Sequence, residues 1–99
     1  MSIIDVAVPI MIDVKEAVSH AMQAFSNLAG QTRAAQALLE EVEMVRDNGA
    51  ACWAVTISVP PGSGPSLASL AASFGNRDYK VLKIDAESGA FVSMKILKI

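Results

Sequence analysis

Cysteine and histidine are almost missing from this sequence, and their scarcity excludes several kinds of chemistry. Cys52 is the only cysteine, so the chain can form neither an internal disulfide nor a cysteine-based metal cluster. A reactive thiol also needs a nearby base, and the sequence around Cys52 offers none. His20 is the only histidine, and with Glu16 four residues before it forms an ordinary helix-surface pair. We therefore predict no catalytic residue, no metal and no cofactor.

A strong net charge and a long apolar run are missing as well. The net charge of −2 is too small to favour nucleic acid or an anionic membrane. No run approaches the roughly 18 apolar residues that a membrane-spanning helix needs. Residues 1–12 lack the basic region and the small-residue cleavage site of a secretory signal. These features predict a cytoplasmic protein without a nucleic-acid or membrane partner.

Apolar residues, by contrast, are abundant for a chain of 99 residues. With glycine counted and tyrosine left out, they make up about 58% of the sequence, against roughly 45–50% in average proteins. A single small domain cannot bury them all, and exposed apolar patches generally mark interfaces. Residues 1–50 hold seven of the ten acids, whereas residues 77–99 hold five of the eight bases. These charges either complement each other, across strands or between subunits, or form two solvated faces. We predict a homo-oligomer.

A β-hairpin over residues 38–59 organises the chain. Asn48-Gly49 is the strongest short-range signal for a two-residue turn, because both central residues of a type I′ turn take positive φ. The turn predicts one apolar face, on which the opposite pairs are Met44–Trp53, Val42–Val55, Glu40–Ile57 and Leu38–Val59. The other face is acidic, hydroxylic or small, with the pairs Glu43–Ala54, Glu41–Thr56 and Leu39–Ser58. We interpret the glutamates of residues 40–43 as a solvated surface, not as an acid–base pair.

A long helix precedes this hairpin. Asp13 is suited to cap its first turn together with Glu16, and Gly30 is suited to end it. Apolar residues recur between them at steps of three and four, as on one face of a helix: Val14, Ala17, Val18, Ala21, Met22, Phe25, Leu28 and Ala29. Residues 31–37 favour a second, short helix.

A second hairpin follows a long connection. Residues 60–78 include a Pro- and Gly-rich stretch and a possible short helix at residues 66–74. The Gly62-Ser63-Gly64 segment lacks the lysine and the spacing of a phosphate-binding loop. Residues 79–85 and 90–99 then form two strands around a turn that ends at Gly89. Pairing Asp85 with Ala90 predicts two partly apolar faces. One holds Tyr79, Val81, Val92, Met94 and Ile96; the other holds Leu82, Ile84, Phe91 and Leu97.

The expected fold class is α+β, with one long N-terminal helix packed on a four-stranded antiparallel meander. Residues 1–12 form an arm, and residues 13–99 form the domain. In the arm, Pro9 restricts the apolar segment to a sheet edge or to contact with a second subunit. The last strand offers an open edge for strand addition by a second copy or by a peptide. The predicted interface residues are Ile4, Val6, Val8, Ile10, Phe91, Leu97 and Ile99.

The order of these parts resembles the PepSY-like family. The likeness rests on the helix sequence VKEAV at residues 14–18, on the strand bearing Trp53, and on KIDAESGAFV at residues 83–92. The resemblance implies a cystatin-like layout and a non-catalytic role in binding or restraining partner proteins. A second likeness, to small gas-vesicle accessory proteins, rests on the strand with Trp53 and Val55 and on the ending that contains Tyr79 and Gly89.

The sequence leaves three functions open. The first is a protein-interaction or regulatory module that self-associates. The second is an enzyme or small-ligand binder that uses a cavity between helix and sheet, lined by Met22, Phe25, Trp53 and Tyr79. The third is an accessory subunit of a larger assembly.

Overall fold

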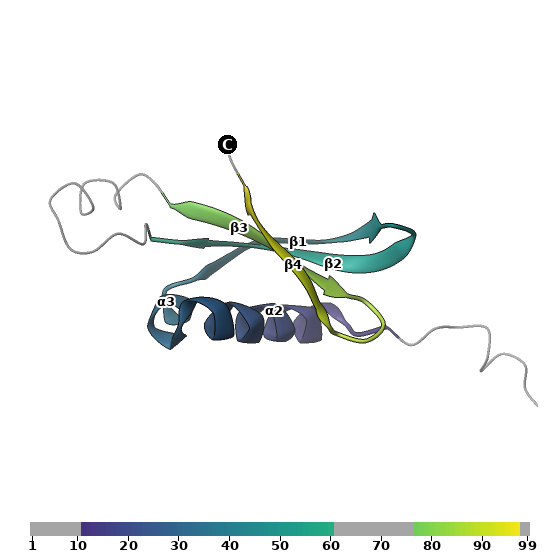
Figure 1. Ribbon diagram of the computed structural model, residues 1–99, viewed down its shortest axis with the longest axis horizontal. Helices are drawn as coiled ribbons and strands as arrows, with labels where there is room; N and C mark the ends of the chain where they lie inside the picture. Colours follow the sequence, from purple (N-terminus) through teal and green to yellow (C-terminus); the bar gives the residue numbers. More distant parts are fainter. Residues whose placement is uncertain (1–10, 61–76, 98–99) are drawn as a thin grey trace, which may run out of the picture.

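The computed structural model describes residues 11–60 and 77–97, in which helices pack on one face of a single antiparallel sheet (Figure 1). The elements are α2 (Val14–Ala29), α3 (Gln31–Ala35), β1 (Leu38–Asp47), β2 (Ala50–Val59), β3 (Asp78–Asp85) and β4 (Phe91–Leu97). The strand order is β1-β2-β3-β4, so each strand pairs with the next one along the chain. The predicted α+β meander is confirmed.

Helix α2 begins and ends as predicted. Asp13 Oδ1 accepts a hydrogen bond from the backbone N–H of Glu16 at 2.8 Å, which satisfies a free donor of the first turn. At the other end, the N–H of Gly30 donates to the carbonyl of Ser26 at 2.8 Å. The short helix α3 follows directly, in agreement with the prediction for residues 31–37.

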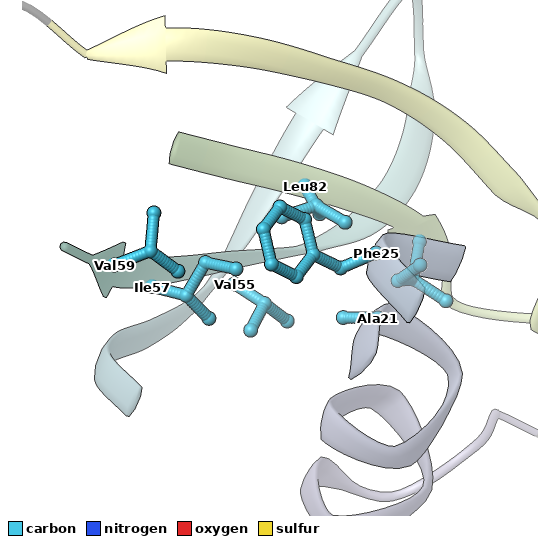
Figure 2. Packing of buried hydrophobic residues seen from close by; sticks show 7 residues of the cluster. Ala21, Phe25, Val55, Ile57, Val59 and Leu82 are labelled. Carbon is cyan, nitrogen blue, oxygen red and sulfur yellow. The ribbon is translucent and has the colours of Figure 1, made fainter. Parts of the chain in front are cut away.

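The core lies between α2 and the two central strands. Figure 2 shows the ring of Phe25 among the aliphatic side chains of β2, with Leu82 of β3 beside it. The residues that are fully buried in this cluster are Ala21, Phe25, Val55, Ile57, Val59, Leu82 and Ile84. The predicted helical stripe is not covered near its two ends, where Val14 and Leu28 are 44% and 57% exposed.

The turn at Asn48-Gly49 is confirmed. Asn48 has φ of 54° and Gly49 has φ of 83°, the two positive values that a type I′ turn requires. Met44 pairs with Trp53 as predicted, and the other predicted pairs hold as far as Glu41 with Thr56. The apolar face of this hairpin is the one that meets α2.

The predicted pairing is wrong beyond Glu41, where β1 contains a bulge. Leu39 lies opposite Ile57 and Leu38 lies opposite Ser58, so Glu40 has no partner residue in the ladder. The three predicted pairs that placed Glu40 opposite Ile57, Leu39 opposite Ser58 and Leu38 opposite Val59 are therefore incorrect. An unbulged strand would have turned the carboxylate of Glu40 toward the buried side chain of Ile57, and burying an unpaired charge is costly.

A second bulge changes the predicted faces of β4. Ile84 pairs with Phe91, but Leu82 pairs with Met94, which leaves Val92 as the extra residue. Met94 and Ile96 therefore share the face of Leu82, and Leu97 pairs with Tyr79 on the opposite face. The prediction that grouped Met94 and Ile96 with Tyr79, and Phe91 with Leu97, is wrong. The bulge also avoids placing Lys95 opposite Lys80, because Lys95 pairs with Val81 instead.

The predicted short helix at residues 66–74 and the first ten residues of the predicted arm lie outside the described residues. At Ile12, just before α2, the chain is hydrogen-bonded to its own sheet. The N–H of Ile12 donates to the carbonyl of Ala86 at 2.8 Å, and Trp53 Nε1 donates to the carbonyl of Ile12 at 3.0 Å.

Candidate interaction surfaces

The sheet has one face that no described helix covers, which we call the outer face. Figure 1 shows α2 and α3 on one side of the sheet, and within residues 11–60 and 77–97 no helix lies on the other. Side chains alternate between the two faces along each strand, so the register assigns the residues of the outer face. They are Leu38, Glu41, Glu43, Val45 and Asp47 on β1, Ala50, Cys52, Ala54, Thr56 and Ser58 on β2, Tyr79, Val81, Lys83 and Asp85 on β3, and Ser93, Lys95 and Leu97 on β4.

The outer face is uneven, because its second strand carries only small side chains. The outward residues of β2 between Cys52 and Ser58 are no more than 8% exposed, although no described helix lies over them. The neighbouring β3 carries the larger side chains of Tyr79, Val81 and Lys83, which are half-buried. The outer face therefore has a line of small side chains along β2, which we call the trough, beside a line of larger side chains along β3, which we call the ridge.

Charge on the outer face differs between the two sheet edges. Glu41 and Glu43 on β1 are exposed acids, and Lys95 on β4 is an exposed base. The ion pair on this face joins Lys83 Nζ to Asp47 Oδ2 at 3.6 Å, next to the β1–β2 turn. Within the described part of the chain, Glu41, Glu43 and Lys95 make no ion pair.

Strand β4 is a sheet edge with large apolar side chains in solvent. Phe91, Val92, Ile96 and Leu97 are all exposed, with Ile96 the most exposed at 66%. Of the predicted interface residues, Phe91 and Leu97 lie here, but on opposite faces of the sheet. The others, Ile4, Val6, Val8, Ile10 and Ile99, lie outside the described residues.

An apolar groove lies where α2 meets β1. It has a volume of about 300 Å³ and is lined by Val14, Lys15, Val18, Leu39 and Val42. The bulge at Glu40 contributes to it, because it turns Leu39 toward the helix side of the sheet. The lining is almost wholly apolar, with Lys15 as its charged residue and no convergent polar groups, so the groove is suited to apolar contact rather than to chemistry.

A polar cluster surrounds Ser58 at the end of the sheet where β2 ends. Ser58 Oγ donates to Glu40 Oε2 at 2.7 Å and accepts from Arg77 Nε at 2.8 Å. Arg77 Nη2 also donates to the carbonyls of Ser58 and Gln36, at 2.9 and 3.1 Å. Ser58 has no exposed surface, so its hydroxyl serves the structure and is closed to a substrate. This cluster was not predictable from the sequence, since it depends on the bulge at Glu40.

The two residues considered for chemistry in the sequence have ordinary surroundings. Cys52 lies in the trough at 2% exposure, where burial, and then the negative charges of Asp47 and Asp85, raise the pKa of its thiol. A raised pKa disfavours the reactive thiolate. His20 is exposed on α2 and lies against Gly89 in the β3–β4 turn.

The β3–β4 turn is held by Asp85. Its Oδ1 accepts hydrogen bonds from the backbone N–H groups of Ser88 and Glu87, both at 2.8 Å. These bonds, with that of Ser88 the largest cause, lower the pKa of the Asp85 carboxyl. Gly89 follows with φ of 78°, as the turn predicted.

The cavity that the sequence suggested between helix and sheet is not formed by the four residues named for it. Phe25 is fully buried in the core, whereas Tyr79 pairs with Ser58 and belongs to the outer face. Trp53 is half-buried at the edge of the core, where its ring nitrogen binds the chain just before α2.

The described residues contain neither a membrane-spanning helix nor a metal-binding cluster. None of the described helices is long and apolar enough to cross a membrane. Across residues 11–60 and 77–97, no three acidic, cysteine or histidine side chains are grouped in a way that would hold a metal ion. No family model, curated protein or solved structure matches the chain.

Proposed function

We propose that this chain is a non-catalytic protein-interaction module that associates with a second copy of itself. The observation that carries the proposal is the number of large apolar side chains exposed to solvent. The described helices cover only one side of the sheet. Among the described residues, ten large hydrophobic side chains are exposed, and four of them belong to β4. Large apolar side chains left exposed in this number are typical of proteins that bind a partner.

The open edge of β4 is suited to a strand from a partner. An edge strand carries backbone N–H and C=O groups without a ladder partner, and an extended peptide can pair with them. Phe91 and Leu97 would then contribute apolar contacts on the two faces of the added strand. A PepSY-like role in binding or restraining a partner is part of this proposal, and the helix-on-meander layout supports it.

Sedimentation velocity over a wide concentration range tests the self-association. We expect a reversible shift from monomer to dimer as the concentration rises from low micromolar to several hundred micromolar. A single monomeric species over the whole range would refute the proposal.

The groove between α2 and β1 favours a second candidate function, the binding of a small apolar ligand. Its volume of about 300 Å³ is at the lower end of the range for ligand sites. A medium-chain fatty acid would place its chain in the groove and its carboxylate at Lys15. Calorimetric titration with this ligand should give saturable binding that is weakened in a Lys15→Glu variant, whereas heats that do not saturate would exclude the candidate.

A further inference from the structure

The pairing register arranges the outer face in rows that run across the four strands. One row consists of Glu41, Thr56, Val81 and Lys95, in the order β1 to β4. The row therefore reads acid, small, apolar, base. The next consists of Glu43, Ala54, Lys83 and Ser93, with a small residue again on β2 and a longer one on β3.

The first row is complementary to the same row read in the opposite direction, from β4 to β1. If two outer faces meet across a two-fold axis parallel to the strands, β1 of one copy lies over β4 of the other, and β2 lies over β3. Glu41 then faces Lys95 of the second copy, and Thr56 faces Val81 of the second copy. The same operation places the ridge along β3 of each copy over the trough along β2 of the other. Charge and shape both fit one symmetric contact, in which each pair occurs twice.

The size of the face agrees with a reversible dimer. Four strands about 4.8 Å apart, with eight residues at about 3.3 Å each, present a footprint of roughly 500 Å² on each copy. A dimer would bury about 1,000 Å² in total, close to the lower limit for a specific interface. The expected affinity is therefore in the micromolar range rather than the nanomolar range.

We propose that the outer face binds the outer face of a second copy, forming a two-sheet sandwich with the helices on the outside. This inference rests on the proposed self-association and assigns a surface to it. Two sheets packed in this way lie about 10 Å apart, with their strands aligned to within about 30°. Both β4 edges remain open in the sandwich, so one dimer presents two edges to partner strands.

Charge reversal tests the assignment. Glu41→Lys and Lys95→Glu each replace two opposite-charge pairs by two like-charge pairs, and each variant alone should dimerise about tenfold more weakly or worse. An equimolar mixture of the two variants restores both pairs and should dimerise like the native protein. Glu87→Lys, which makes the same charge change in the exposed β3–β4 turn, is the matched control and should dimerise normally. Thermal unfolding of each variant checks that the fold is retained.

A fourth variant separates this contact from pairing between sheet edges. Val81→Asp places a charge on β3, away from both edge strands, so it should abolish the face-to-face dimer and leave any edge pairing intact. Dimerisation of unchanged affinity in Glu41→Lys or in Val81→Asp would overturn the inference while the proposed self-association stands. Failure of the mixture to dimerise would also overturn it. A native protein that remains monomeric at all concentrations would refute both.

Discussion

The contact between Gly89 and His20 gives a sharp test of the packing of the β3–β4 turn on α2. A methyl group added at Gly89 would lie 2.9 Å from His20 Nε2, and within 3.3 Å of two further ring atoms. Gly89 also has φ of 78°, where a residue with a Cβ atom is strained by roughly 1–2 kcal/mol. Displacing the imidazole from its rotamer should add about 0.5–1.5 kcal/mol. We expect Gly89→Ala to lower the free energy of unfolding by about 1.5–3.5 kcal/mol in total.

Gly49 provides a matched control for the backbone contribution. It has φ of 83°, but an added Cβ would meet no atom within 4 Å. Gly49→Ala should therefore cost only the backbone strain, about 1–2 kcal/mol. The excess destabilisation in Gly89→Ala measures the displacement of the His20 ring.

A double-mutant cycle isolates the ring directly. In a His20→Ala background, the Gly89→Ala change should cost about 1–2 kcal/mol, because only the backbone strain remains. Urea unfolding followed by the fluorescence of Trp53, the only tryptophan, measures each free energy. If Gly89→Ala costs the same with and without His20, the ring does not lie against the turn. If it costs nothing in either background, the positive φ at Gly89 is also refuted.

Three further substitutions probe other contacts. The lowered pKa of Asp85 means that its carboxylate stabilises the fold fully above the ordinary value of 3.8, and that this contribution is lost as the pH falls through the lower folded value. Asp85→Asn should therefore be destabilising at neutral pH, and its difference from the native protein in urea titrations should shrink in acid. Ser58→Ala removes the hydroxyl bound to Arg77 and should lower the unfolding free energy by about 1–3 kcal/mol, measured by urea unfolding at pH 7; an unchanged midpoint would contradict the cluster. Trp53→Phe loses the hydrogen bond to Ile12 and should cost about 1 kcal/mol or slightly more, measured by circular dichroism because the fluorophore is gone.

The fold was largely predictable because strong local signals agreed with one another. The cap at Asp13, the break at Gly30 and the turn at Asn48-Gly49 each have a short-range physical cause, and all three are present. The Asn48-Gly49 turn then determined which residues pair in the first hairpin, as far as Glu41. Sequence reasoning succeeded wherever neighbouring residues alone decide the conformation.

The two bulges were not predicted, because a bulge is favoured by contacts across the fold rather than by a local preference. Each one resolves a conflict that continuous pairing would have caused, at Glu40 against Ile57 and at Lys95 against Lys80. A one-residue shift moves every later side chain to the other face. For this reason the prediction that Phe91 and Leu97 share a face was wrong, although both side chains are exposed.

The outer face itself was partly foreseen. The sequence indicated that the second face of the first hairpin is acidic, hydroxylic or small, and the structure confirms this for Glu43, Ala54 and Thr56. The rows that continue onto β3 and β4 were not foreseen, since they depend on the register beyond the second bulge. The row from Glu41 to Lys95 therefore could not be predicted from the sequence.

Arg33 and Arg77 bind the chain on both sides of residues 61–76, and these contacts bear on how well the protein tolerates changes in the length of that segment. Arg33 donates to the carbonyl of Pro60 at 3.0 Å and pairs with Asp78 at 3.5 Å, while Arg77 is bound to Ser58. The departure and return points of the intervening stretch are thus fastened to adjacent strands independently of what lies between them. Doubling the length of a flexible insert costs only about 0.6 kcal/mol in closure entropy. New sequence can therefore be accommodated here, through evolution or grafting, while the meander keeps its alignment.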